Sequence, residues 1–116
     1  RKFANLTTVH LSHMVESFIN HLEFEKRTSR HTIIAYRKDL EQFEEFSRLS
    51  FEQEDISKAD HGTIRAWVID LVEQGLNPSS VNRKIATLRS FYKFLMRSGE
   101  ITQDPTYKIR SLKTPK

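Results

Sequence analysis

Between Asn77 and Gly99, apolar side chains recur every three or four residues, the spacing that places them along one side of an α-helix. Asn77 is followed by a proline, and the stretch closes with a glycine. Asparagine caps helix starts, proline suits the first helical position, and glycine is favoured just past a helix end. We therefore expect a helix of about six turns, with a buried side formed by Val81, Ile85, Leu88, Tyr92, Leu95 and Met96.

The same periodicity predicts three further main helices and no strand. They are expected over 12–26, over 30–48, and from about 58 to a stop at Gly75, with a short C-terminal helix over 106–109. The expected start signals are Thr28 or Ser29, Ser57 with Asp60 as a variant capping box, and Asp104 before a proline. Short connections between amphipathic helices favour a compact all-α bundle of four main helices plus the short C-terminal helix.

Length and composition fit a single helical domain. The chain has 116 residues, 37% of them hydrophobic and eight of them Phe, which is enough for one packed core. There is no Cys for disulfides and no apolar run of membrane-spanning length, which favours a cytoplasmic domain. A start at Arg1, not Met, favours a piece of a longer protein. We expect a flexible segment over 1–11, the helical domain over 12–110, and the start of a linker over 111–116.

Positive charge is concentrated towards the C-terminus. The net charge is +4 overall, but from Leu76 onward nine Lys and Arg residues face only Glu100 and Asp104. Charge gathered in one part of a chain creates a local field whose usual partners are polyanions. The expected helix over 78–98 carries much of this charge.

On that helix Arg83, Arg89, Lys93 and Arg97 share one polar arc that no acidic residue interrupts. A solvated face usually mixes signs, because opposite charges four residues apart stabilise a helix. Phosphate contact explains the unmixed sign better than solvation does. Asn82, on the same arc, can pair with a base edge. Ser79 and Ser80 open the helix, where backbone N–H groups and the positive dipole end suit a phosphate.

The expected helix over 30–48 shows a weaker form of the same pattern. Arg30, Arg37 and Lys38 share an arc near its start, and the glutamates over 41–45 follow along that arc. Carboxylates repel DNA, so only the first two turns are expected to touch it. Ile34 lies on this exposed arc, where it would either contact a thymine methyl or be a scattered apolar residue.

No pattern in the sequence predicts catalysis. The five His residues lack zinc-ligand spacing, and the three Gly residues form no phosphate-binding loop. Neighbouring carboxylates such as Glu44 and Glu45 are expected on solvated faces, and Tyr36 and Tyr92 in the core. We therefore expect a binding domain with no catalytic residue, metal or cofactor.

Two stretches resemble the N-terminal core-binding domain of tyrosine recombinases, the Xer-like phage integrase group. They are "FINHLEFEKRTSRHTIIAYRKDLEQFEEF" and "GLNPSSVNRKIATLRSFYKFLMRSGEITQDPTYKI". The most specific positions are Ser29, Thr32, Ala35, Tyr36, Asp39, Leu40 and Phe43, together with "VNRKIATLRSFYKFL". The likeness extends over roughly 15–116, and the ending "DP....I...K.PK" is similar to the family's lead into its catalytic domain.

This resemblance implies a SAM-like helical bundle that clamps one side of duplex DNA, while a covalently linked C-terminal catalytic domain clamps the other. It places the second and fourth helices towards the major groove, and other recombinase protomers beside the domain in a tetrameric synapse. It implies a location at the nucleoid of a bacterium or with a phage or mobile element, and no membrane. The expected DNA contacts are Arg30, Thr32, Arg37, Lys38, Ser79, Ser80, Asn82, Arg83, Arg89 and Lys93.

Two other functions fit the same residues. One is a stand-alone helical DNA-binding regulator, and the other is a protein-interaction domain whose basic face docks an acidic partner. Steep salt dependence of DNA binding would separate the DNA-binding functions from the protein-interaction domain.

Overall fold

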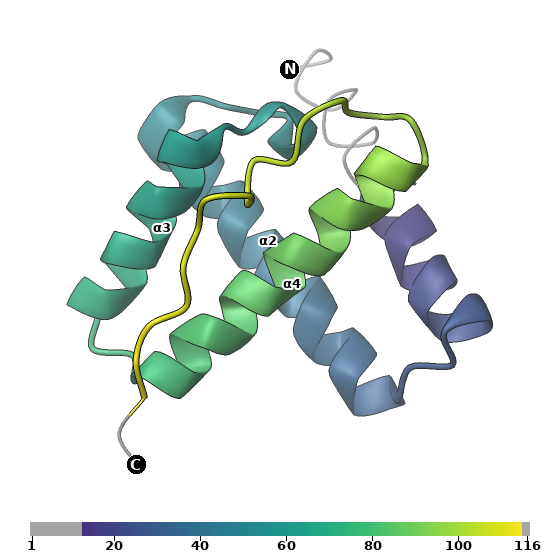
Figure 1. Ribbon diagram of the computed structural model, residues 1–116, viewed down its shortest axis with the longest axis horizontal. Helices are drawn as coiled ribbons and strands as arrows, with labels where there is room; N and C mark the ends of the chain where they lie inside the picture. The colour runs from purple at the N-terminus through teal and green to yellow at the C-terminus, as the bar shows by residue number, and fades with distance from the viewer. Residues whose placement is uncertain (1–12, 115–116) are drawn as a thin grey trace. The chain divides into compact units, whose positions relative to one another are not determined.

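The computed structural model describes residues 13–114, in which helices alternate with short connections and no strand occurs (Figure 1). An α-helical stretch over 13–20 continues into the π-helical turn η1 (His21–Glu25). It is followed by α2 (Arg30–Phe51), the 3₁₀ turn η2 (Ile56–Lys58), α3 (His61–Glu73) and α4 (Pro78–Arg97). The predicted all-α class with four main helices is confirmed. The segment over 1–11 lies outside the described residues. Backbone contacts divide the chain into two units, with the boundary between Ile56 and Ser57.

The first unit pairs the helical stretch over 13–25 with α2. The rings of Phe18 and Tyr36 stack across this pair with centroids 6.1 Å apart and planes 5° from parallel. In the connection between the two helices, Arg27 adopts a left-handed backbone with φ 52°. Ser29 is the N-cap of α2, where its hydroxyl oxygen accepts the Thr32 N–H at 3.3 Å. The predicted start of the second helix is therefore confirmed.

The end of α2 lies one turn beyond its predicted end at residue 48. The helix continues to Phe51, and Glu52 then takes the left-handed conformation with φ 53°. Its N–H donates to the Arg48 carbonyl at 3.1 Å. The periodicity of buried residues did not predict this last turn. Its apolar side chains, Leu49 and Phe51, are 70% and 48% exposed, so they do not continue the buried side of the helix.

In the second unit, α3 starts differently from the prediction. Its N-cap is Asp60, whose carboxylate accepts the Thr63 N–H at 2.9 Å and the Thr63 hydroxyl at 3.2 Å. The capping box expected at Ser57 was wrong, because η2 occupies that position and the backbone becomes extended at Asp60 before the helix begins. The cap N–H of Thr63 holds the pKa of Asp60 below its usual value.

Helix α4 begins and ends where the sequence predicts. Asn77 caps it by accepting the Ser80 N–H at 2.9 Å, and Pro78 occupies the first position. Gly75 and Gly99, just past the ends of α3 and α4, have φ of 94° and 78°, a region that favours glycine. The predicted stripe is buried except for Met96, which is 38% exposed. It packs against α3 within this unit.

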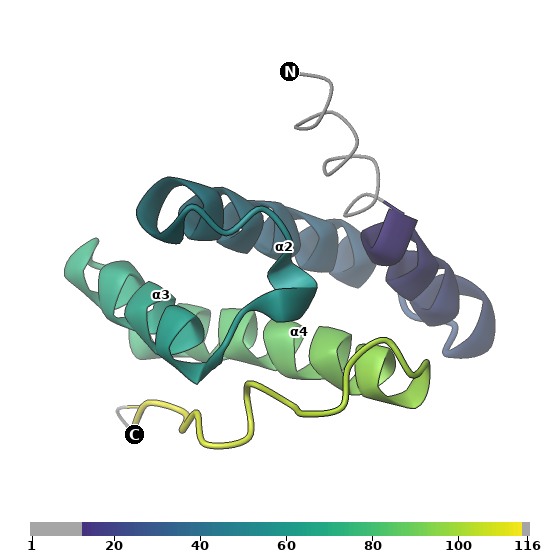
Figure 2. The same cartoon turned by 90° about the horizontal axis from the view of Figure 1, so that it is seen from above.

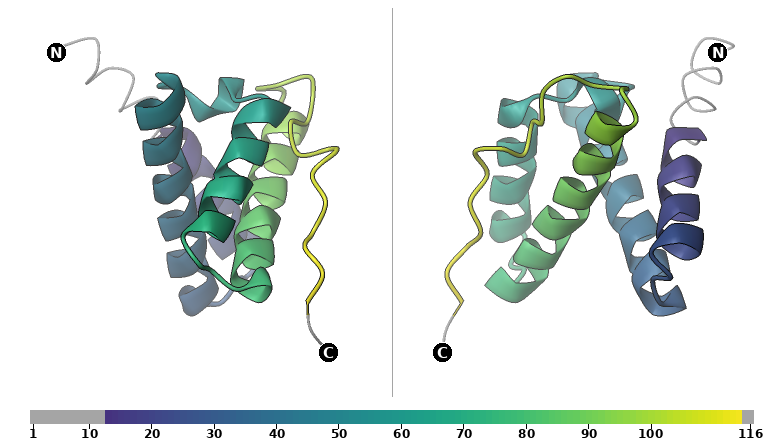
Figure 3. Two further views of the ribbon diagram at one scale, coloured as in Figure 1. Left: turned by 90° about the vertical axis from the view of Figure 1, so that its left-hand side faces the viewer. Right: turned by 45° about the vertical axis from the view of Figure 1, so that its right-hand side comes forward.

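After α4 the chain turns back and runs along the second unit, antiparallel to α4 (Figures 2 and 3). Residues 105–108 form successive turns, so the short C-terminal helix predicted over 106–109 was wrong. Only bonds from Tyr107 N–H to Asp104 and from Ile109 N–H to Thr106 form, each three residues back. Beyond Ile109, the Leu112 main chain bonds to Asn82 of α4, and these bonds take the place of further helical ones. We call residues 104–112 the C-terminal segment.

Candidate nucleic-acid interface

Four basic side chains of α4 form what we call the α4 cationic face: Arg83, Arg89, Lys93 and Arg97. Arg83, Lys93 and Arg97 are exposed, and Arg89 is half-buried. The helix contains no acidic residue. Burial of the opposite side of α4 explains why this face points outward. The face therefore presents positive charge that no carboxylate of its own helix offsets.

Asn82 lies beside this face and is bonded to the C-terminal segment. Its Nδ2 donates to the Leu112 carbonyl at 2.9 Å, and the Leu112 N–H donates to its Oδ1 at 2.7 Å. The Asn82 amide thus donates one hydrogen bond to the Leu112 main chain and accepts one from it, so both of its polar atoms are used. Any base contact by these atoms would have to replace the two bonds.

Arg89 is bonded to the same segment. One of its guanidinium nitrogens donates to the Ile109 carbonyl at 2.5 Å, and the other donates to the Ser111 hydroxyl oxygen at 3.4 Å. Both acceptors are neutral, so Arg89 keeps its full positive charge. Arg89 therefore contributes to the field of the face even while its donors are occupied.

The start of α4 offers less to a phosphate than the sequence suggests. Ser79 is exposed and Ser80 is half-buried. The Ser80 N–H is already used by the cap residue Asn77.

On α2, the basic side chains differ in exposure and partners. Arg30 and Lys38 are exposed, and Thr32 is half-buried with its Oγ1 accepting the Ser29 hydroxyl at 2.9 Å. The Arg37 guanidinium forms a two-pronged ion pair with the Glu16 carboxylate. Hydrogen bonding to Arg37 holds the pKa of Glu16 below its usual value. Ile34 is 57% exposed, as its place on the polar arc predicts.

The glutamates that follow on α2 reduce the positive charge of this region. Glu41 and Glu45 are exposed, and Glu44 is half-buried. Burial, and then the neighbouring Glu41 charge, raise the pKa of Glu44. The basic region of α2 is therefore confined to its first turns.

Lys84 is a basic residue of α4 that does not lie on the exposed face. Only 7% of it is exposed, beside the buried stripe that contains Val81, Ile85 and Leu88. Lys84 comes three residues after Val81 and four residues before Leu88, so it lies on the same side of the helix as the buried stripe. This spacing distinguishes it from Arg83 in the sequence.

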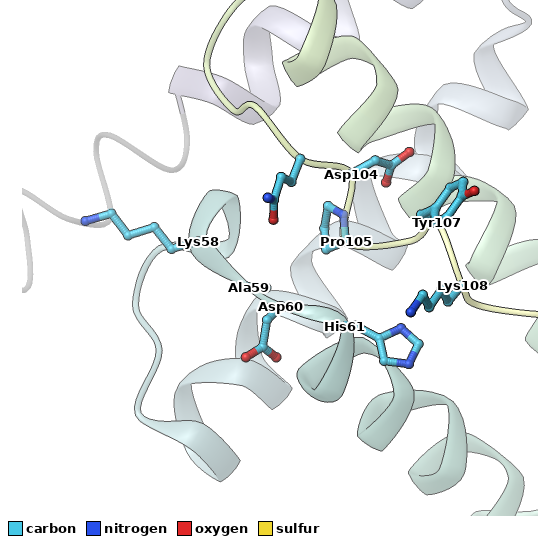
Figure 4. A pocket seen from close by; sticks show the side chains of 9 residues that line it. Lys58, Ala59, Asp60, His61, Asp104, Pro105, Tyr107 and Lys108 are labelled. Atoms are coloured by element: carbon cyan, nitrogen blue, oxygen red, sulfur yellow. The ribbon is translucent and has the colours of Figure 1, made fainter.

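Further basic groups lie around the C-terminal segment, where no helical pattern in the sequence indicates a site. A cavity of about 500 Å³ lies between the start of α3 and this segment, as Figure 4 shows. A neighbouring cavity of about 420 Å³ shares His61 and Lys108 with it and adds Arg65 and Arg110. The Asp104 carboxylate beside the first cavity accepts the N–H and hydroxyl of Thr106. The segment therefore adds positive charge to the second unit.

Within residues 13–114, no group of three or more His, Asp or Glu side chains is arranged to hold a metal ion. Over the same residues, no helix is both long and apolar enough to cross a membrane.

Residues 15–99 match the family model described as "Phage integrase, N-terminal SAM-like domain". The chain is 41% identical over 105 residues to "Tyrosine recombinase XerC" of Roseiflexus castenholzii, covering 89% of this chain and 32% of that protein. It is 39% identical over 102 residues to "Tyrosine recombinase XerC" of Oceanobacillus iheyensis, covering 88% of this chain and 33% of that protein. The chain thus spans about a third of the length of these curated relatives. No solved structure matches it significantly.

Proposed function

Because this chain belongs to the family of phage integrase N-terminal SAM-like domains, we propose that it binds duplex DNA for a site-specific tyrosine recombinase. The observation that carries the proposal is the α4 cationic face, which has one sign of charge, is largely exposed, and is followed by a basic C-terminal segment. A surface of this kind neutralises phosphates along a duplex and releases their counterions. The relatives' printed name, tyrosine recombinase, supports DNA as the polyanion.

In the proposed protein, strand exchange belongs to a further, C-terminal catalytic domain that the longer relatives have room for. The present chain then supplies grip and orientation, and other recombinase protomers are its partners in a tetrameric assembly. On this proposal the isolated chain binds duplex DNA weakly, because it provides one half of a two-domain clamp. It neither nicks nor exchanges strands.

Among the expected contacts, Arg83 and Lys93 are best placed, since both are exposed on a helix without carboxylates. Arg30 and Lys38 extend the contact from α2, with Thr32, Ser79 and Ser80 as hydroxyl partners for phosphate oxygens. Arg37 is a weaker candidate, because it is paired with Glu16. Contact through Asn82 and Arg89 stays a prediction that requires their release from the C-terminal segment.

The test is a titration of the 116-residue chain with a duplex at several salt concentrations. We expect the logarithm of the binding constant to fall linearly with the logarithm of salt, and Lys93→Ala to make that slope shallower by about one unit. Ser98, the C-cap residue of α4, is exposed and uncharged, so Ser98→Ala is the control and should leave the slope unchanged.

Three outcomes would contradict parts of the proposal. Binding that is absent, or that does not vary with salt, would favour a protein-interaction domain with an acidic partner. Strong, sequence-selective binding by the chain alone would favour a stand-alone DNA-binding regulator. Nicking of the duplex by the purified chain would show catalysis where none is proposed.

A further inference from the structure

We infer that Asn82 and Arg89 are positioning residues that hold the C-terminal segment along α4 and so fix the direction in which the chain leaves the helical domain. The bonds that carry this inference belong to the second unit alone. The use of the fixed direction, to orient a following catalytic domain, rests on the proposed function.

The spacing of Asn82 and Arg89 along α4 matches the spacing of the residues that they bind on the extended C-terminal segment. Asn82 and Arg89 are seven residues apart, which is about 10.5 Å along a helix. Their targets, Leu112 and Ile109, are three residues apart, which is about 10–11 Å in an extended chain. The two lengths agree, so both attachments form with the segment extended and antiparallel to α4.

The hydrogen bonds from Asn82 and Arg89 to the C-terminal segment use both donor and acceptor atoms. The Asn82 amide both donates to and accepts from the main chain of Leu112, so it fixes the orientation of that peptide as well as its distance. Arg89 adds two donors to the Ile109 carbonyl and the Ser111 hydroxyl. Ile109 itself is only 7% exposed, so an apolar anchor lies directly where Arg89 binds. Polar bonds to Ile109, Ser111 and Leu112 and the burial of Ile109 thus hold the same short stretch of chain.

This role separates Asn82 and Arg89 from the other residues of the polar arc. A bidentate contact to adenine would use the Nδ2 and Oδ1 atoms of Asn82 that already bind Leu112. Arg83 and Lys93 are instead exposed on the outer side of the helix. The structure therefore divides the arc into residues that hold the chain and residues that face outward.

The first experiment follows amide hydrogen exchange at Leu112 in the 116-residue chain. Asn82→Ala removes the acceptor of the Leu112 N–H, and we expect exchange there to become about ten times faster. Asn82→Asp keeps the acceptor oxygen and should restore part of the protection. Arg97→Ala, a change on the same helix that removes no bond to the segment, is the control. Unchanged exchange at Leu112 in Asn82→Ala would overturn the inference.

The second experiment measures the direction of the chain. The sequence has no cysteine, so Ser98→Cys and Thr114→Cys place two unique spin labels on the end of α4 and beyond the segment. We expect one narrow distance distribution in the parent chain, and a broad one after Asn82→Ala or Arg89→Ala. Arg89→Lys keeps the charge but not the two-pronged geometry, so broadening there too would assign the effect to hydrogen bonding. A distribution equally narrow in all variants would contradict the inference.

Adding a saturating duplex separates this inference from the proposed function. If Asn82 and Arg89 position the chain, Leu112 stays protected in the complex and the label distance stays narrow. If DNA binding removed the protection at Leu112 and broadened the label distance, the two side chains would have been released to the duplex. That result would overturn their assignment as positioning residues. Absence of any duplex binding would contradict the proposed function, while the exchange and distance results without DNA would still decide the inference.

Discussion

The basic side chains of α2 and α4 have different partners, and the difference determines how much charge each helix can offer. On α2, Arg37 is paired with the Glu16 carboxylate, so its charge is largely cancelled within the first unit. On α4, Arg89 binds a carbonyl and a hydroxyl, so its donors are used but its charge remains. Hydrogen-bond occupancy and charge neutralisation are thus separate properties, and only the second removes an arginine from a long-range field.

The largest effect should come from reversing charge on the helix that keeps its charge. Arg83→Glu should weaken duplex binding about tenfold, because it removes one cation near the phosphates and adds an anion. Arg48→Glu makes the same change at the end of α2, beyond the glutamates, and should cost much less. Binding constants at one low salt concentration test this. Equal losses at the two positions would mean that the chain attracts DNA through net charge alone.

A second prediction removes the carboxylate that cancels Arg37. Glu16→Gln should free the guanidinium, strengthen duplex binding about threefold at low salt, and steepen the salt dependence by about one unit. Glu23→Gln changes the net charge equally at an exposed position without a bond to Arg37, and is the control. If both variants bind DNA alike, the pairing of Arg37 does not limit the contribution of α2.

The ion pair also predicts a pH dependence of stability. Because Arg37 holds the pKa of Glu16 below its ordinary value of 4.5, the stabilisation is fully present above that value. It is lost as the pH falls through the lower pKa of the folded state. The pair is partly exposed, so we expect Glu16→Gln to cost under about 1 kcal/mol at pH 7. Unfolding measurements should show this difference vanish in acid; a difference that persists there would have another cause.

The smallest effect concerns the acidic end of the basic region on α2. The pKa of Glu44 is raised, mainly by burial, so its ionisation costs stability progressively as the pH rises from the ordinary value of 4.5 to the raised value, and in full above it. Glu44→Gln should stabilise the chain at pH 7 by about 0.2–0.5 kcal/mol, the range of a like-charge helical pair. Below the ordinary value of 4.5 the gain should disappear. Glu45→Gln makes the same change of charge at the exposed neighbouring position and is the control.

The sequence predicted the helices well where local chemistry determines them. Asn77, Pro78 and Gly99 bound α4 as expected, because caps and backbone conformations depend on near neighbours. The end of α2 was missed, since its last turn buries little apolar surface. The capping box at Ser57 failed because two polar residues three apart fit several starts, and Asp60 is the one that accepts an N–H.

The partners of the candidate site residues were beyond sequence reasoning. The polar arc of α4 identified its basic and exposed members from helical geometry alone. The bonds from Asn82 and Arg89 join residues separated by between 20 and 30 positions, and no local pattern encodes them. The same holds for the pairing of Glu16 with Arg37, which lie 21 positions apart on separate helices. A side chain's exposure follows from its own helix, but its partner depends on tertiary structure.

The pairing at Asn82 has a consequence for which substitutions the chain tolerates. The amide of Asn82 recognises the peptide group of residue 112 and not its side chain, so almost any amino acid can stand at that position. Proline is the exception, because it has no N–H to donate. Position 82 has no such freedom, since only asparagine or the longer glutamine carries an amide donor and acceptor together. Sequence variation should therefore be unequal across one pair of contacting residues: permissive at 112 and restricted at 82.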